Sequence, residues 1–328
     1  MHVSLHFPAR CLFIMLVLSS MTQTVSLIWA QNYPQKPVRI IATEIGGTGD
    51  VVARIIARGL APLLGQPLVV ENRTAVVAAQ TGAAATPDGY TLVLAGNGSW
   101  IAPLIQKTQY DMLRDFATVS QVSSSPLVLV VNPTLPVKSV KELIALAAAK
   151  PGTLNFAVAP TGSANHLAAE LFKSMVGINI VGVPYKGAGP ALTALIAGEV
   201  QLMFPPAGAA MSQVNAGRVR ALAVTSALPS PLCVGLPTIA ASGLPGYEAS
   251  NINGMFVPAG TSAIIIEELD QNISEVLTNP DVREKFFRTG FEAVASSPAE
   301  FAAAIKADIS RLGKVIKDAG IRVDGAAN

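Results

Sequence analysis

Residues 154–204 read LNFAVAPTGSANHLAAELFKSMVGINIVGVPYKGAGPALTALIAGEVQLMF, and in this stretch short apolar runs alternate with longer amphipathic segments. The apolar runs predict three strands, at 154–158, 180–183 and 200–204. Helices are predicted between them, at 165–176 and 190–197. Gly177 ends the first helix, as glycine commonly does. Strand–helix alternation of this kind indicates an α/β fold, with parallel sheets covered by helices.

The same alternation continues on both sides of this stretch. Further strands are predicted at 38–43, 67–71, 90–95, 116–122, 126–132 and 218–224. Helices are predicted at 50–64, 139–150, 264–277 and 298–319. The second of these opens with the capping-box pattern Ser139-Val140-Lys141-Glu142. We therefore expect strand–helix units along most of the chain.

The first 30 residues have the pattern of a secretory signal peptide. Arg10 precedes an uncharged run from Cys11 to Ala30 with an apolar centre, and the polar Gln31 follows. This order predicts export and cleavage near Ala30. The alternative is an uncleaved membrane anchor, because about 20 uncharged residues can span a bilayer. Ser, Thr and Gln residues dilute the run and favour the signal peptide.

Composition argues against several functional classes. The formal net charge of the 328 residues is +2, which gives no basic surface for nucleic acid. Removal of the leader leaves Cys233 as the one cysteine, so no internal disulfide is expected. His166 would be the one histidine left, which argues against a histidine-based zinc site. A hydrolase using Ser163 or Ser99 with His166 lacks a G-x-S-x-G motif. We expect neither an enzyme nor a cofactor.

Three loops share one construction, in which a predicted strand leads through glycine or serine into a predicted helix. Unpaired N–H groups at a helix start and the close approach allowed by glycine suit a carboxylate or phosphate. Such loops lie outside the carboxyl ends of strands, where open α/β sheets bind ligands. The candidate ligand-binding residues are Ile45, Gly46, Gly47, Asp50, Thr161, Gly162, Ser163, His166, Tyr185, Lys186 and Gly187.

These residues also have ordinary structural interpretations. Asp50 and His166 could cap their helices, and Tyr185 could pack on the adjoining strand. Lys186 could be a solvated lysine, which is the commoner state of that residue. The recurrence of one construction three times is what favours ligand binding.

Six short motifs in order along the chain resemble those of the Bug family, the periplasmic substrate-binding receptors of tripartite tricarboxylate transporters. They are YPQKPVR at 33–39, GQPLVVENR at 65–73, PDGYTL at 87–92, VPYKG at 183–187, LAVTS at 222–226 and VPAGT at 257–261. The most specific is VPYKG, and the set covers nearly all of the chain after the leader.

The resemblance implies a type II periplasmic-binding-protein fold. Two α/β domains would be joined by two crossing strands, with a ligand cleft between them. The implied division is 31–125 plus 259–328 as domain 1 and 126–258 as domain 2, with crossings near 126–132 and 254–258. Backbone amides and ordered water would hold the ligand's carboxylate at the loops named above.

The implied function is that of an extracytoplasmic receptor, monomeric and periplasmic. It would bind a small organic carboxylate or amino acid and deliver it to the permease subunits of a tripartite tricarboxylate transporter. An alternative is a sensor that presents the solute to a membrane kinase. This chain departs from the family pattern at Glu44, at 74–78 and at Pro205-Pro206. If Glu44 faces the cleft, a monocarboxylate or zwitterion should bind better than citrate.

Overall fold

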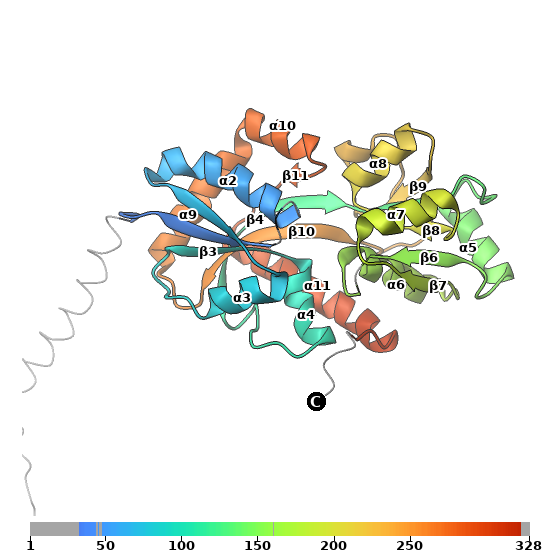
Figure 1. The fold of residues 1–328 in the computed structure, drawn as a ribbon, viewed down its shortest axis with the longest axis horizontal. Helices are drawn as coiled ribbons and strands as arrows, with labels where there is room; N and C mark the ends of the chain where they lie inside the picture. Colours follow the sequence, from blue (N-terminus) through green and yellow to red (C-terminus); the bar gives the residue numbers. More distant parts are fainter. Residues whose placement is uncertain (1–32, 44, 46–47, 160, 323–328) are drawn as a thin grey trace, which may run out of the picture.

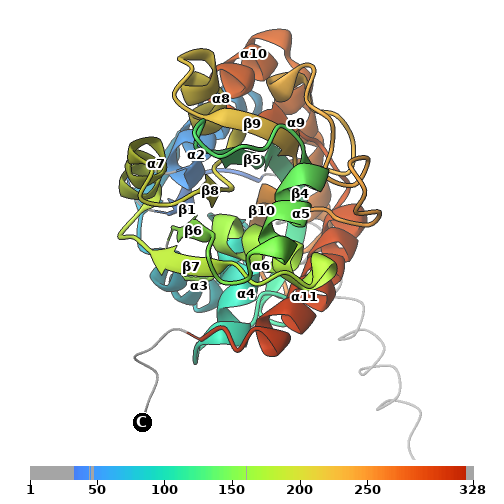
Figure 2. The ribbon, with the colours of Figure 1, turned by 90° about the vertical axis from the view of Figure 1, so that its right-hand side faces the viewer.

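The computed structural model describes residues 33–43, 45, 48–159 and 161–322. The leader, Glu44, Gly46, Gly47 and Pro160 lie outside the described residues. The described chain forms two sheets, each covered by helices (Figures 1 and 2). It is a two-domain α/β fold, as the sequence predicts. None of its described helices combines the length and apolarity needed to cross a membrane.

The first sheet has six strands in the order β11-β4-β10-β3-β1-β2. Its strands are β1 (Val38–Ala42), β2 (Leu68–Asn72), β3 (Thr91–Gly96), β4 (Phe116–Pro126), β10 (Ser250–Pro258) and β11 (Glu292–Ala293). The helices around it are α2 (Thr48–Leu64), α3 (Ala75–Ala83), α4 (Asn97–Ile105), α9 (Ala263–Thr278), α10 (Pro280–Arg288) and α11 (Pro298–Asp318). β1 is parallel to β2 and β3, whereas β10 is antiparallel to β3 and β4.

The second sheet has five strands in the order β7-β6-β8-β5-β9. Its strands are β5 (Val128–Val131), β6 (Asn155–Val158), β7 (Val181–Pro184), β8 (Leu202–Met203) and β9 (Arg220–Val224). Its helices are α5 (Val140–Ala149), α6 (Ala164–Val176), α7 (Ala188–Ala197), α8 (Ala207–Asn215) and the short 3-10 turn η1 (Pro231–Cys233). β6 is parallel to β7 and β8, but β5 is antiparallel to β8 and β9. Both sheets are therefore mixed, whereas the strand–helix alternation predicted parallel sheets.

The chain passes between the sheets twice. It leaves the first sheet at the end of β4 and enters the second at the start of β5, so one crossing lies at Pro126–Val128. The return is at Ser250, which already pairs with Pro126 in the first sheet. Residues 254–258, expected near the second crossing, lie inside β10 and pair with β4 along their length. Because Ser250 already belongs to the first sheet, the second crossing lies just before it.

The serine run 123–125, predicted to separate two strands, continues β4 without a break. Serine is a weak strand former, but distant groups satisfy these buried hydroxyls. The Ser125 hydroxyl donates to the Gly290 carbonyl over 2.8 Å, and the Ser123 hydroxyl accepts from Asn253 Nδ2 over 3.1 Å. Tertiary hydrogen bonds thus override the local preference.

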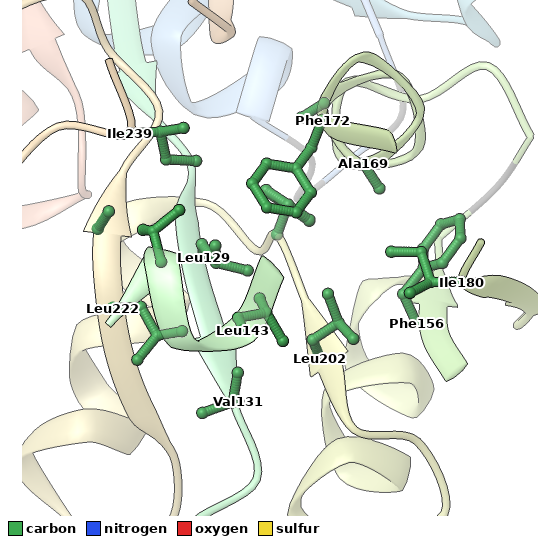
Figure 3. Packing of buried hydrophobic residues seen from close by; sticks show 14 of the residues in the cluster. Leu129, Val131, Leu143, Phe156, Ala169, Phe172, Ile180, Leu202, Leu222 and Ile239 are labelled. Atoms are coloured by element: carbon green, nitrogen blue, oxygen red, sulfur yellow. The ribbon is translucent and has the colours of Figure 1, made fainter. Parts of the chain in front are cut away.

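The second domain has its core between α5, α6 and the sheet. Figure 3 shows Leu129, Leu143 and Leu202 converging there, with Phe172 above them. Val315 of α11 joins this cluster, whereas Leu167 of α6 joins the cluster around Phe256 and Phe301 in the first domain. The α6–α11 contact therefore couples the two cores.

Candidate functional site

The first candidate loop leads from β1 into α2, and Figure 1 shows the start of α2 facing α7 of the second domain. Ile45 is 81% exposed. Asp50 is buried, and its Oδ1 accepts from Arg54 Nε at 2.8 Å and from Asn72 Nδ2 at 3.0 Å. Asn72 also donates to the Thr43 carbonyl. Asp50 thus ties the first turn of α2 to the end of β2. Gly46 and Gly47, which lie between Ile45 and Asp50 in the sequence, are outside the described residues.

The second loop leads from β6 into α6. Ser163 caps the helix, with its Oγ accepting from the His166 N–H over 3.4 Å. Gly162 has φ of +80°, a backbone conformation that L side chains rarely adopt. A Cβ at Gly162 would collide with Ile105 at the end of α4, so this loop packs closely against the first domain.

The third loop leads from β7 into α7. The Tyr185 N–H donates to the Val158 carbonyl over 2.9 Å, because β7 and β6 are parallel neighbours. The second and third loops therefore lie side by side at one edge of the second sheet. The Tyr185 side chain packs against the hydrophobic cluster around Ala191, which agrees with the packing role considered for it above. Lys186 is exposed. Gly187 is the N-cap of α7, and no side chain caps this helix start.

His166 is buried, and its ring bridges the loop and the helix. Nδ1 accepts from the Gly162 N–H over 3.1 Å, and Nε2 lies 3.8 Å from Glu170 Oε1. Glu170 pairs with Lys173 over 2.8 Å. Burial lowers the pKa of the His166 imidazole, the nearby Glu170 raises it, and Lys173 lowers it further. The neutral imidazole is the form that fits this hydrogen bond.

A cavity of about 520 Å³ opens between α6 and the end of α11; we call it the α6–α11 pocket. Its lining residues are Thr161, His166, Glu170, Lys173, Ser174, Ile178, Val315, Asp318, Ala319, Gly320, Ile321 and Arg322. Of the described candidate residues, only Thr161 and His166 line it. The pocket thus adjoins the start of α6, and no described candidate residue of the other two helix starts lines it.

A fourth helix start was missed in the sequence. The chain Gly96-Asn97-Gly98-Ser99 leads from β3 into α4, and it has the same strand–glycine–helix construction. Asn97 is buried, its Oδ1 accepting from the Ile252 N–H over 2.6 Å. The glycine-rich sequence directly after a predicted strand was the available signal.

A charged network centred on the buried Asp308 was also not predicted from the sequence. Asp308 of α11 accepts from Asn97 Nδ2 and Trp100 Nε1, each over 2.8 Å, and from Arg311 over 3.0 Å. Arg311 continues to Glu248 over 3.2 Å, just before the return crossing at Ser250. This network, hereafter the Asp308 network, links α4, α11 and the return crossing.

Comparison with known proteins decides the family. The family model described as "Tripartite tricarboxylate transporter family receptor" matches residues 52–321. This chain belongs to that receptor family. BugT of Bordetella pertussis (strain Tohama I) is 36% identical over 301 residues, covering 90% of this chain and 92% of BugT.

Solved structures of similar chains give the same result. The R. palustris protein Rpa4515, solved with adipate, is 35% identical with a TM-score of 0.76, covering 88% of this chain and 99% of its own. MatC from Rhodopseudomonas palustris, solved with malate, is 30% identical with a TM-score of 0.73, covering 87% and 100%. The resemblance to Bug-family receptors and the type II fold are confirmed, and the family is one of solute receptors, not enzymes.

Proposed function

We propose that this receptor binds a small organic carboxylate in a cleft between its domains and delivers it to the permease subunits of a tripartite tricarboxylate transporter. The observation that carries the proposal is the set of helix starts at the carboxyl ends of β1, β6 and β7. Such starts offer backbone N–H groups and a partial positive charge to an anion. The adipate and malate bound to two similar receptors support this ligand class.

The proposed contacts come from three elements. In the first domain they are at the start of α2, and in the second at the starts of α6 and α7. The residues proposed to bind the ligand, or to position those that bind it, are Ile45, Gly46, Gly47, Asp50, Thr161, Gly162, Ser163, His166, Tyr185, Lys186 and Gly187. Among these, Asp50 would hold the first turn of α2 through Arg54 and Asn72, and His166 would hold the Gly162 N–H.

We also propose where the domains divide. Residues 31–126 and 250–328 form the first domain, and the chain between the two crossings forms the second.

The leader 1–30 directs export to the periplasm and is removed. N-terminal sequencing of the exported protein should begin at or near Gln31, and a full-length chain in the membrane fraction would contradict this.

Calorimetric titration with adipate, malate, citrate and an amino acid tests the ligand class. We expect saturable binding of one carboxylate per chain, because one set of helix starts serves one anion. Citrate should bind less well than a monocarboxylate or zwitterion if Glu44 faces the cleft. Adipamide, which lacks both charges, is the control for adipate. Equal binding of the diamide and the acid would show that the site does not select a carboxylate.

A further inference from the structure

The loop before α6 and the first turn of that helix are joined by two reciprocal hydrogen bonds. The His166 N–H donates to Ser163 Oγ over 3.4 Å, and the Gly162 N–H donates to His166 Nδ1 over 3.1 Å. The arrangement resembles a capping box in which an imidazole replaces the carboxylate. Because Nδ1 accepts, the ring must carry its proton on Nε2.

The loop makes a left-handed turn at Gly162 and is tightly packed. Gly162 has positive φ, and Ile105 of the first domain lies against it. His166 itself is held in place, with 9% of its surface exposed. The ring therefore fixes the position of Gly162 between two domains.

We infer that neutral His166 is a positioning residue: its Nδ1 holds the Gly162 N–H and so sets the shape of the 161–163 loop that starts α6. This inference rests on the proposed function, in which that loop faces the ligand. It changes the role expected for His166 from a ligand contact to a support behind the loop. Because the Gly162 N–H donates to His166, this N–H is not available to bind a ligand.

Protonation would break this arrangement. A protonated Nδ1 cannot accept, so the Gly162 N–H would face another N–H instead of a lone pair. The charged groups around the ring are Glu170 and Lys173 on its own helix and Asp318 and Arg322 across the α6–α11 pocket. Glu170 would attract the imidazolium, but it faces Nε2 and cannot replace the lost bond at Nδ1.

The pH dependence follows from the direction of the shift. Burial lowers the pKa of His166 in the folded protein, so the neutral form is favoured there. Its stabilisation is complete above the ordinary pKa of histidine and is lost as pH falls through the folded pKa. If protonation abolishes binding, affinity for adipate should fall by up to about tenfold per pH unit below that pKa.

Two substitutions separate support from direct contact. In His166→Asn the Oδ1 atom takes the place of Nδ1, so the Gly162 bond is kept but no longer titrates. In His166→Gln the amide takes the place of Nε2, so that bond is lost. We expect adipate and malate to bind His166→Asn nearly as well as the wild type at pH 7.5. The ratio of wild-type to His166→Asn dissociation constants should rise as the pH is lowered through the His166 midpoint. If His166→Gln binds the ligand as well as the wild type and His166→Asn does not, the inference is overturned.

Nitrogen NMR of the imidazole gives a readout that needs no ligand. The sequence has three histidines, His2, His6 and His166, so the signal missing from His166→Asn identifies the ring. We expect the Nε2-protonated tautomer and a Gly162 amide signal that shifts at the His166 midpoint. An Nδ1-protonated ring, or a Gly162 amide indifferent to that midpoint, would overturn the inference. If neither adipate nor malate binds while the NMR result holds, the proposed ligand class fails and the support role stands.

Discussion

Replacing Asp308 with alanine should destabilise the protein by about 2–6 kcal/mol, because two buried donors lose their acceptor at about 1–3 kcal/mol each. Asn97 Nδ2 and Trp100 Nε1 both donate to one oxygen of this carboxylate. Arg311 would also lose a partner, although Glu248 would remain beside it. Urea unfolding measures the change, with the free energy of unfolding extrapolated to water.

Asp318→Ala is the matched control for this prediction. Asp318 is the last residue of the same helix and is exposed, so its loss should change stability by less than about 0.5 kcal/mol. Asp308→Asn should fall between the two, since it keeps an acceptor but loses the charge. An Asp308→Ala protein as stable as Asp318→Ala would mean that the network contributes nothing to holding α4 and α11 together.

Gly162→Val should weaken carboxylate binding by at least about tenfold, or 1.4 kcal/mol. A valine cannot easily adopt φ of +80°, and its Cβ would collide with Ile105. The tip of the Ile105 side chain can shift aside, so the backbone conformation is the larger obstacle. Valine drives the backbone away from positive φ, which moves the loop and the start of α6 with it. Calorimetry with adipate at pH 7.5 measures the loss, after circular dichroism has shown that the variant is folded.

Gly177→Val controls for backbone strain. Gly177 ends the same helix with φ of +66°, and nothing lies within 4 Å of the place its Cβ would take. This variant should lose about 1–2 kcal/mol of stability through the left-handed backbone but bind adipate normally. Gly162→Ala repeats the test with a smaller side chain if the valine variant does not fold. Normal binding by a folded Gly162 variant would place the ligand elsewhere.

Strongly periodic elements of this fold could be predicted closely. The helix expected at 165–176 is α6 (Ala164–Val176), and the one expected at 139–150 is α5 (Val140–Ala149). Both have a clear apolar face and a recognisable cap. Four helices were missed: α3 and α4, whose periodicity Ala, Gly and Pro blur, and also α8 and α10. The formation of α3 and α4 depends on packing against the first sheet, which local sequence does not show.

The candidate site, like the fold, could be predicted only in part. The helix starts could be predicted, because glycine or serine between a strand and a helix is a local signal. The supporting contacts could not. Asn97 meets Asp308 across 211 residues of sequence, and Ser125 meets Gly290 across 165. Even His166, four residues from Gly162, was expected to contact the ligand, since only the folded loop shows which atom its ring faces.

The central claim is that a carboxylate binds between the two domains, joined by crossings at 126–128 and just before Ser250. Small-angle X-ray scattering of the protein with and without saturating adipate or malate tests it most directly. Ligand contacts with both domains should favour a closed form. We expect a smaller radius of gyration with the ligand that calorimetry shows to bind. An unchanged scattering curve with that ligand fully bound would contradict it.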